Sequence, residues 1–338
     1  PSREDPYPLV CLEAAECGLP IVCFDKAGGM PDFVRQDAGD VVKYLDAFEA
    51  AKSIGTFISN EKYRIEAGKI ARNRVLKNHS DQVAVPEILN NMRLATNIKP
   101  SVSIIVLIYN QERFVKKRIE SIINQSFRDF EIIILDDAST DNSYQIAKSY
   151  EWHPSIKVCK NDQNTGSPAK QIRKGIELAT SDIIWIAEGD DYCDSEFLKK
   201  LLPAFNDKDV VLSYCNSTIV DEAGAETGDY KAYYEKLDFN HWKNSYVVKA
   251  EHEVNFGLGV KNTIPNFSAV LFRKKYIDDS VFKVLENFKL SGDWYFYLSL
   301  IKNKKVAFCN EKLNYHRKHK QTLTTEFNTT DSLKELLL

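Results

Sequence analysis

Two pairs of adjacent aspartates each follow a run of hydrophobic residues. Asp190-Asp191 come after the run at 183–187, and Asp136-Asp137 come after the run at 130–135. A continuous hydrophobic run is typical of a buried strand in a parallel sheet, and α/β sheets bind ligands at the carboxyl ends of their strands. Paired carboxylates repel each other unless a cation joins them, and a divalent metal bound to phosphate oxygens is a natural partner. Because Gly-Asp-Asp is also common in turns, the stretch at 183–191 alone fits a strand-end turn equally well.

Strand and helix patterns alternate through the middle of the chain, and this alternation would bring both aspartate pairs to one edge of a sheet. It predicts a parallel sheet with right-handed crossovers. Tyr109 ends a third strand at the same edge, where an aromatic ring and a carboxylate together suit a nucleobase. Asn110 is expected to cap the helix that follows. The expected strands are 103–109, 130–135, 156–159, 183–189 and 210–214, and the expected helices are 111–125, 139–150, 166–179 and 195–205.

The composition is that of an ordinary globular protein and argues against several classes. Hydrophobic residues make up 43% and charged residues 28%, and the net charge of -3 does not suggest nucleic acid as a partner. The seven cysteines are scattered without a Cys-x-x-Cys motif, which argues against a disulfide framework or a zinc site and fits a reducing cytoplasm. No hydrophobic run approaches a membrane span, and no signal peptide is visible.

Positive charge is concentrated in one region of the chain. Residues 240–320 contain 15 Lys and Arg against 7 Asp and Glu. Such a region suits a nucleotide, a phospholipid surface or a lipid-linked phosphate, although a solvated basic face is the more common explanation. The chain begins with Pro1 rather than an initiator Met, and we expect it to be a fragment of a longer polypeptide.

Five short motifs between residues 101 and 325 occur in the order known from one enzyme family. They are 102–112, 125–131, 136–141, Asn164–Gly166 and Asp190-Asp191. In these motifs the chain resembles the family 2 glycosyltransferases. The resemblance implies a GT-A fold for residues 102–325, which is an α/β structure with a mostly parallel, Rossmann-like nucleotide-binding sheet. Residues 326–338 would then be a C-terminal extension.

The resemblance also implies a nucleotide-diphospho-sugar donor and assigns residues to its parts. Tyr109 and Asp137 would contact the base, and Asp190 would contact the ribose. Asp191 would hold a divalent metal, Mn²⁺ or Mg²⁺, on the diphosphate. Glu112, at the end of the first motif, is a further expected donor-binding residue.

Lys170 is the last expected donor-binding residue, and it would approach the diphosphate. The alternative for Lys170, and for the nearby Arg173, is an ordinary solvated helix residue. Two positions depart from the family pattern: Leu107, where many members have Pro or Thr, and Arg173, where many have Asn. These departures concern the finer donor contacts rather than the class of enzyme.

Two more site residues come from C-terminal stretches. Asp293 lies in Ser291–Leu298, where family 2 members carry their catalytic carboxylate at the start of a helix, so it is the expected general base. The alternative is that Asp293 caps this helix. His316 lies in the basic stretch 314–324, which resembles a segment that folds over the donor, and it is the expected second metal ligand. A surface loop is the alternative for this stretch.

Residues 1–97 form a separate, partial α/β region, joined to the next by a linker at 98–101. Its stretch 2–15 resembles the donor-binding half of the family 4 glycosyltransferases, which have the GT-B fold, with Asp5 and Glu13 at the positions of the family's two acidic residues. A helix N-terminus there would offer N–H groups to a diphosphate. Because the other half of such a cleft is absent, we expect this half-GT-B region to be an inactive structural remnant.

The expected function is therefore sugar transfer, with inversion, from a nucleotide-diphospho-sugar to a hydroxyl of a glycan or lipid-linked glycan. The enzyme would be a hexosyl- or deoxyhexosyltransferase of surface-polysaccharide synthesis, located in the cytoplasm and in peripheral contact with the inner face of the membrane. Alternatives are a non-catalytic nucleotide- or polysaccharide-binding module, a glycoside hydrolase, which also needs two carboxylates, and transfer with retention.

Overall fold

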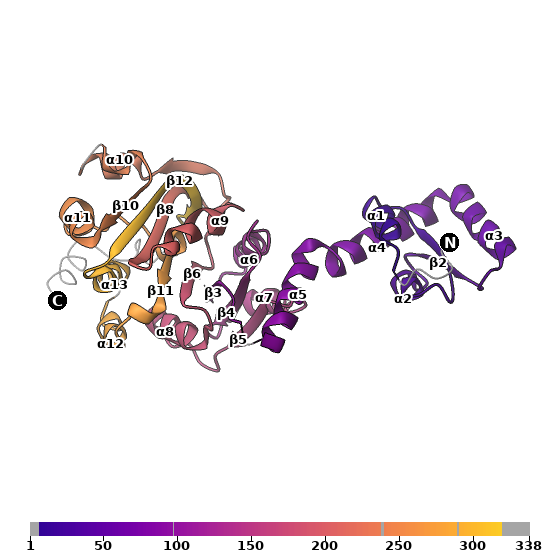
Figure 1. The fold of residues 1–338 in the computed structure, drawn as a ribbon, viewed down its shortest axis with the longest axis horizontal. Coiled ribbons are helices and arrows are strands. Elements are labelled where there is room, and N and C mark those ends of the chain that lie inside the picture. The colour runs from indigo at the N-terminus through magenta and orange to yellow at the C-terminus, as the bar shows by residue number, and fades with distance from the viewer. Residues whose placement is uncertain (1–6, 97, 238–239, 289–290, 320–338) are drawn as a thin grey trace. The chain divides into compact units, whose positions relative to one another are not determined.

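A computed structural model describes residues 7–96, 98–237, 240–288 and 291–319. Its chain contacts define two compact units, Pro1–Glu87 and Ile88–Leu338 (Figure 1). Helix α5, Asp81–Thr96, spans the boundary in the sequence. The C-terminal turns of α5 belong to the second unit, since Asn90 donates a hydrogen bond to the carbonyl of Pro154 at 2.6 Å and Arg93 pairs with Asp129.

The N-terminal unit is a small α/β structure around two parallel strands, β1 (Ile21–Phe24) and β2 (Gly39–Val42). Glu13 is exposed on its first helix, whereas Asp5 lies outside the described residues. Gly18, with a positive φ of 78°, ends that helix in a conformation that glycine adopts without strain. The helices of the unit are α1 (Leu9–Glu16), α2 (Met30–Val34), α3 (Ala47–Ser59) and α4 (Glu61–Asn78).

A ten-stranded sheet organises the C-terminal unit, and its main path has the strand order β10-β12-β8-β11-β6-β3-β4-β5. The four strands at one end of this path are parallel, as the sequence predicts. They are β3 (Val102–Ile108), β4 (Phe130–Asp136), β5 (Ile156–Lys160) and β6 (Ile183–Glu188).

The other half of the sheet is mixed, which sequence alternation did not predict. Strand β11 (Val270–Arg273) lies between β6 and β8 and is antiparallel to both. Strand β8 (Val210–Val220) is longer than the predicted 210–214, and it pairs in parallel with β12 (Lys305–Arg317). Strand β10 (Tyr246–Lys249) is antiparallel to β12, while β7 (Tyr192–Cys193) and β9 (Glu226–Asp229) pair with β12 and β8.

Hydrophobic side chains alternate between the two faces of the central strands and form one core on each face. In β3, Ile105 belongs to one core, and Ile104 and Val106 belong to the other. Helices α6 (Val115–Ile123), α7 (Ser143–Lys148) and α9 (Phe197–Leu201) contribute to the second core. Helices α8 (Pro168–Leu178), α12 (Ser280–Leu285) and α13 (Gly292–Ile301) contribute to the first (Figure 1).

The prediction that Asn110 caps the following helix is wrong. Helix α6 begins only at Val115, and its N-cap Phe114 makes no side-chain capping bond. Asn110 has a positive φ of 52°, and its side-chain oxygen accepts hydrogen bonds from the backbone and hydroxyl of Thr140. The residue therefore joins the loops after β3 and β4 instead of starting a helix.

Short helical segments lie between these strands in the C-terminal unit. They are η1 (Leu202–Asn206), α10 (Lys231–Glu235), η2 (His241–Lys243), α11 (Ala250–Glu253), η3 (Val254–Leu258), η4 (Phe267–Ala269) and η5 (Lys274–Tyr276). None of the helices in the described ranges has the length and hydrophobicity of a membrane span.

Candidate active site

Parallel pairing brings the carboxyl ends of β6, β3 and β4 together, as the sequence predicts. Leu107 of β3 is in register with Glu188 of β6, and Ile108 is in register with Asp136 of β4. The two aspartate pairs therefore follow strands that flank β3, the strand that ends before Tyr109. This edge of the sheet is where α/β folds of this kind bind ligands.

Gly189 is required where β6 turns into Asp190-Asp191. A Cβ atom there would lie 2.8 Å from the carbonyl oxygen of Leu107 and 2.1 Å from the side-chain oxygen of Gln111. The nitrogen of Gly189 also donates to that Leu107 carbonyl at 3.1 Å. The close approach of the two backbones fixes the start of the acidic turn against the end of β3.

Asp191 is buried, and the fold holds both of its carboxylate oxygens. Oδ1 accepts a hydrogen bond from the backbone N–H of Arg317 at 2.8 Å, and Oδ2 accepts one from the side-chain amide of Asn266. Burial raises the pKa of Asp191 to about 7, and the charge of Asp190 adds to the shift. The carboxylate is therefore fixed in position but is costly to ionise in the absence of a further cation.

Asp190 is paired with a histidine that the sequence analysis did not select. His319 Nε2 lies 2.9 Å from Asp190 Oδ2, and the His319 ring packs on Phe114 with centroids 5.1 Å apart. Burial alone would raise the pKa of Asp190, but the hydrogen bond and charge of His319 hold it below its usual value. Asp190 therefore carries a negative charge at neutral pH.

Glu188 is a third carboxylate at this turn. Its side chain accepts a hydrogen bond from Ser268 Oγ at 3.3 Å, and its backbone carbonyl accepts one from the buried Arg118 at 2.8 Å. Burial, followed by the charges of Asp191, Asp190 and Asp293, raises the pKa of Glu188 to about 8. Glu188, Asp190, Asp191 and Asp293 thus form one electrostatically connected site.

Asp293 lies in the first turn of α13 and is not its N-cap residue, which is Ser291. Asp293 Oδ1 accepts a hydrogen bond from the backbone N–H of Trp294 at 2.7 Å, and Oδ2 accepts one from Asn262 Nδ2 at 3.0 Å. Burial raises the pKa of Asp293 to about 7, although both hydrogen bonds act in the opposite direction. A carboxyl group with a pKa near neutrality suits general base catalysis.

The two residues predicted to contact the base are both at the expected edge. The Tyr109 side chain is 46% exposed, so its ring is available for stacking. Asp137 is buried, and Oδ1 accepts hydrogen bonds from Asn161, from Thr165 N and from Gln171 at 2.7 to 3.0 Å. Its Oδ2 accepts one from the Thr165 hydroxyl at 2.8 Å, which leaves more acceptor capacity on Oδ2 than on Oδ1.

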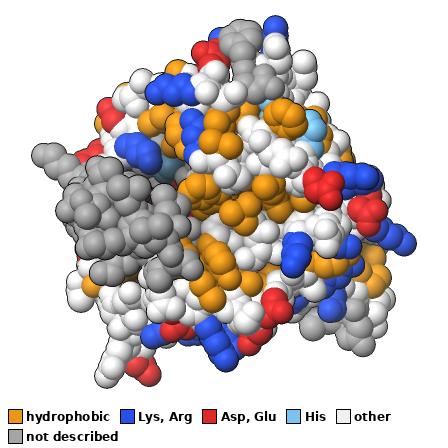
Figure 2. All heavy atoms as spheres, turned by 90° about the vertical axis from the view of Figure 1, so that its left-hand side faces the viewer, with side chains coloured by type: hydrophobic (Ala, Val, Ile, Leu, Met, Phe, Trp, Pro, Cys, Tyr) orange, Lys and Arg blue, Asp and Glu red, His pale blue; other side chains and the backbone are white. Residues whose placement is uncertain are grey.

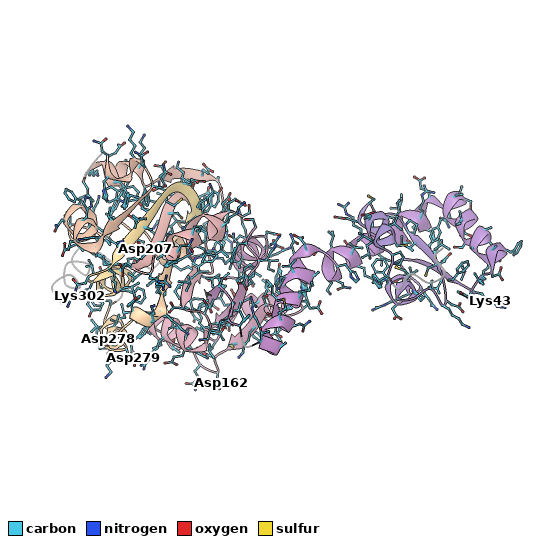
Figure 3. The ribbon with its side chains drawn as sticks, in the orientation of Figure 1. Lys43, Asp162, Asp207, Asp278, Asp279 and Lys302 are labelled. Atoms are coloured by element: carbon cyan, nitrogen blue, oxygen red, sulfur yellow. The ribbon has the colours of Figure 1, made fainter. Side chains whose placement is uncertain are left out.

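Glu112 and Lys170 lie in other surroundings. The carboxylate of Glu112 accepts two hydrogen bonds from Asn142, both at 3.0 Å, and so joins the loops that follow β3 and β4. Lys170 is exposed in the first turns of α8. Arg173, on the same helix, pairs at the surface with Glu177 and with Asp279, which Figure 3 labels. The surface alternative is therefore the one that fits Arg173.

His316 does not lie in a surface loop, so that alternative is wrong for residues 314–317, which belong to β12. The His316 side chain is buried, and Nδ1 lies 2.6 Å from the hydroxyl of Tyr230. Burial lowers the pKa of His316 to about 3, so the imidazole is neutral. If Nδ1 donates to Tyr230, Nε2 is the lone-pair nitrogen that a metal needs. Residues 320–324 of the predicted stretch lie outside the described residues.

The chemistry of the acidic turn fits a divalent metal. Its carboxylate oxygens are the ligands that Mg²⁺ and Mn²⁺ prefer. Burial, with the charges of neighbouring carboxylates, raises the pKa values of Glu188 and Asp191, and a cation beside them would favour their ionised forms. Within the described ranges, no three His, Cys, Asp or Glu side chains form a complete metal site. A metal here would need further ligands, such as the phosphate oxygens of a donor.

Sequence reasoning missed the residues that form hydrogen bonds with the carboxylates, namely Asn262, Asn266, Ser268 and His319, and also the buried Arg118, which donates to the backbone carbonyl of Glu188. Each is far from its partner in the chain, and none lies in a motif that its spacing identifies. His319 offered a weak signal, because it is in the same basic stretch as the chosen His316.

Comparison with known families gives two matches. Residues 103–280 match the model of Glycosyl transferase family 2, and residues 1–74 match that of Glycosyl transferases group 1. The two regions and their order are those expected from the motifs. The first match covers the parallel strands, both aspartate pairs and the segment that carries Asn262 and Asn266.

Individual relatives agree with the first match. The chain is 30% identical over 241 residues to the uncharacterized glycosyltransferase MJ1057 of Methanocaldococcus jannaschii, covering 66% of this chain and 81% of that protein. It is 32% identical over 99 residues to the poly(ribitol-phosphate) beta-N-acetylglucosaminyltransferase TarS of Staphylococcus aureus, covering 29% of this chain and 17% of TarS. A Bacillus subtilis relative is 42% identical over 106 residues, which cover 38% of its length, so the chain spans less than half of the length of this relative and of TarS.

A solved structure supports the fold. The crystal structure of TarS residues 1–349 in complex with UDP-GlcNAc aligns with a TM-score of 0.52 and 20% identity, covering 71% of this chain and 64% of that one. At this identity, the likeness shows the GT-A fold and does not extend to the ligand.

Proposed function

Because the chain belongs to glycosyl transferase family 2, we propose that its C-terminal unit transfers a sugar from a nucleotide-diphospho-sugar to a hydroxyl of a glycan or lipid-linked glycan, with inversion at the anomeric carbon. The observation that carries this proposal is Asp293. Its pKa of about 7 and its charge coupling to Glu188 give a poised base at the carboxylate-lined strand edge. No such base is needed by a module that only binds nucleotide.

In this proposal, the nucleotide lies along the ends of β3, β4 and β6. The exposed ring of Tyr109 stacks on the base, and Asp137 accepts a base N–H on its less occupied oxygen, Oδ2. Asp190 accepts the ribose hydroxyls as an ionised carboxylate. Each of these residues lies just after the carboxyl end of β3, β4 or β6.

Asp191, with His316 as a further candidate, would hold a Mn²⁺ or Mg²⁺ ion that supplies positive charge to the leaving diphosphate. The buried setting of Asp191 makes that charge more effective than it would be in water. Lys318 lies close enough for its charge to act on Asp190, Asp191, Glu188 and Asp293, so it is a protein cation available to the same phosphates.

Asp293 removes the proton from the acceptor hydroxyl. The acceptor oxygen forms a bond to the anomeric carbon while the bond from that carbon to the diphosphate breaks on the opposite face. The proton passes to Asp293, and the nucleoside diphosphate leaves with the electron pair. A single displacement of this kind inverts the configuration, and identification of the product anomer distinguishes it from retention.

Binding of nucleotides provides the first test of the proposal. We expect UDP, GDP, dTDP or CDP to raise the melting temperature selectively, and only when Mn²⁺ or Mg²⁺ is present, because a ligand that binds the native state stabilises it by mass action. Since a structure of the relative TarS contains UDP-GlcNAc, UDP is the first nucleotide to test. A shift without turnover of any sugar donor would favour the non-catalytic binding module, and no shift with any nucleotide would contradict the donor site.

The acceptor is proposed to belong to a surface polysaccharide. The name of TarS gives poly(ribitol-phosphate) as its acceptor, which is also a polymer. Figure 2 shows the face of the C-terminal unit that carries α10 and α11, where hydrophobic side chains gather among Lys and Arg side chains. Exposed hydrophobic residues on these elements and their neighbours are Tyr233, Val247, Phe256 and Val260. Together with the basic region at 240–320, they suit a lipid-linked acceptor at a membrane surface in the cytoplasm.

Binding to liposomes checks this membrane contact. We expect vesicles with anionic lipid to retain the protein at low salt and to release it at high salt, because screening weakens attraction between exposed charges. Neutral vesicles are the control and should retain little protein. Failure of anionic vesicles to retain the protein at low salt would contradict the membrane contact, without bearing on the donor site.

A further inference from the structure

Among the residues that the structure describes, three carboxylates have raised pKa values, and one short segment of the chain contacts all three. This segment, Asn262–Ser268, follows η3 and leads into β11, and it contains no acidic or basic residue. Its hydrogen bonds run from Asn262 Nδ2 to Asp293 Oδ2 at 3.0 Å, from Asn266 Nδ2 to Asp191 Oδ2, and from Ser268 Oγ to Glu188 Oε2 at 3.3 Å.

Asn262 is itself held in one orientation. Its side-chain oxygen accepts a hydrogen bond from Ile264 N at 3.2 Å, and its backbone carbonyl accepts one from the Tyr233 hydroxyl at 2.9 Å. With the oxygen committed to Ile264, the NH₂ group must point toward Asp293. The direction of the amide therefore follows from its own hydrogen bonds.

The start of α13 is tied to the same part of the chain. The indole nitrogen of Trp294 donates to the carbonyl of Leu258 at 2.6 Å, while its backbone N–H donates to Asp293 Oδ1. The hydrogen bond from Trp294 to Leu258 thus fixes the backbone that carries Asp293, and the hydrogen bond from Asn262 fixes the rotation of the Asp293 carboxylate. Rotation about the last side-chain bond of an aspartate is otherwise soft.

We propose that Asn262 is a positioning residue for the general base: its amide holds Asp293 in the orientation, and in the ionised form, that accepts the proton of the acceptor hydroxyl. This inference rests on the proposed function, in which Asp293 is the base. A donor to a carboxylate oxygen favours the ionised form over the protonated form.

Other ionisable groups also face Asp293. Lys318 favours its ionised form, whereas Glu188 of β6 acts against it. The phenols of Tyr233, from α10, and Tyr297, from α13, are electrostatically coupled to Asp293 and stay neutral at the pH of interest. Asn262 is thus a neutral hydrogen-bond donor to Asp293, while the charges of Lys318 and Glu188 act on the ionisation of Asp293 in opposite directions.

The test is Asn262→Asp, which keeps the size of the side chain and its acceptor for Ile264 but replaces the donor with a carboxyl group. We expect the apparent pKa of Asp293 to rise by about one unit or more, since a hydrogen bond to a charged group is worth about 1.5–3 kcal/mol and one unit is 1.36 kcal/mol. Titration of ¹³C-labelled aspartates by NMR measures this pKa directly, with Asp293→Asn identifying the signal.

Turnover should follow the titration. The acid limb of the pH profile of kcat should move up by about the same one unit, which lowers the rate at pH 7 about fivefold for a base with a pKa near 7. The KM for the donor should stay unchanged. Asn262→Ala should shift the limb in the same direction and provides a second variant if Asn262→Asp folds poorly. Asn287→Asp, an exposed asparagine after α12, is the matched control and should leave the profile unchanged.

The outcomes separate the two proposals. An unchanged Asp293 titration in Asn262→Asp would overturn the role of Asn262 and leave the proposed function standing. A shifted titration with an unchanged pH profile would show that ionisation of Asp293 does not control the rate, and it would overturn both Asp293 as the base and the role of Asn262. Normal turnover by Asp293→Asn would instead overturn Asp293 as the base, whatever Asn262 does to its titration. Parallel shifts of the titration and the acid limb support the inference.

Discussion

Asp293→Asn is expected to abolish sugar transfer and to preserve nucleotide binding. The variant keeps the size of the side chain but removes the group that takes the acceptor proton, and a positioned base is worth roughly a hundredfold to ten-thousandfold in rate. Donor affinity should be retained because the groups proposed to hold the nucleotide follow β3, β4 and β6, whereas Asp293 lies on α13 and is proposed to contact the acceptor. Initial rates with the donor found by thermal stabilisation, together with its Kd, measure the two effects separately.

The same residue gives the wild-type enzyme a defined pH dependence. Because Asp293 must be ionised to act and its pKa is about 7, the rate should be low below pH 6 and should rise through about pH 7 to a plateau. The direction follows from the raised pKa, since a carboxylate with an ordinary pKa would be ionised across this whole range. A pH profile that is flat between 5 and 8 would contradict the assignment.

A matched control distinguishes catalysis from helix capping. Asp278 is exposed near the start of α12 and accepts a hydrogen bond from the backbone N–H of Ser280, so it has a structural role at another helix (Figure 3). Asp278→Asn should leave turnover unchanged. If Asp293→Asn lowers the melting temperature and loses nucleotide binding together with turnover, the residue is structural and the proposed base is wrong.

The second large effect is expected for Asp191→Asn, which should lose metal-dependent nucleotide affinity. A unit charge pair at 4 Å is worth about 4 kcal/mol at an effective dielectric of 20, or nearly a thousandfold. Asp191 also accepts hydrogen bonds from Arg317 N and from the side-chain amide of Asn266. Because asparagine has the same shape as aspartate, this variant separates the loss of charge from the loss of packing. Calorimetric titration of nucleotide with and without Mn²⁺ measures the effect.

The control for this variant is Asp162→Asn, an exposed aspartate in the loop after β5 that Figure 3 labels. It should bind nucleotide as the wild type does. Asp191→Asn should retain whatever weak affinity the nucleotide has without metal. Equal metal-dependent affinities for Asp191→Asn and the wild type would exclude Asp191 as the metal ligand and direct attention to Glu188 and Asp190.

The sequence alone determined the class of the fold and one edge of the site. Hydrophobic runs such as 132–135 and 183–187 are local signals, because a strand buried on both faces is hydrophobic at nearly every position. Parallel pairing then requires that residues after each run meet at one edge. For this reason Asp136-Asp137, Asp190-Asp191 and Tyr109 were predicted correctly to follow neighbouring strands, and the motifs correctly indicated both families.

Local patterns were less reliable where a tertiary contact competes with them. Asn110 has the residue type of a helix cap, but its side chain forms hydrogen bonds with Thr140 across the loop. The stretch around His316 is polar and basic, as surface loops are, yet it continues β12 into the buried part of the sheet. In both places, a partner distant in the chain decided the conformation.

Only the tertiary structure decided which groups hold and charge the carboxylates. Asn262 and Asn266 approach Asp293 and Asp191 because β11 runs between β6 and β8, an insertion that strand and helix alternation does not reveal. His319 reaches Asp190 from a position 129 residues later in the chain. Burial, which raises the pKa values of Asp191 and Asp293 to about 7, depends on how all of these segments pack together, so a sequence supplies the carboxylates while the assembled fold sets their protonation.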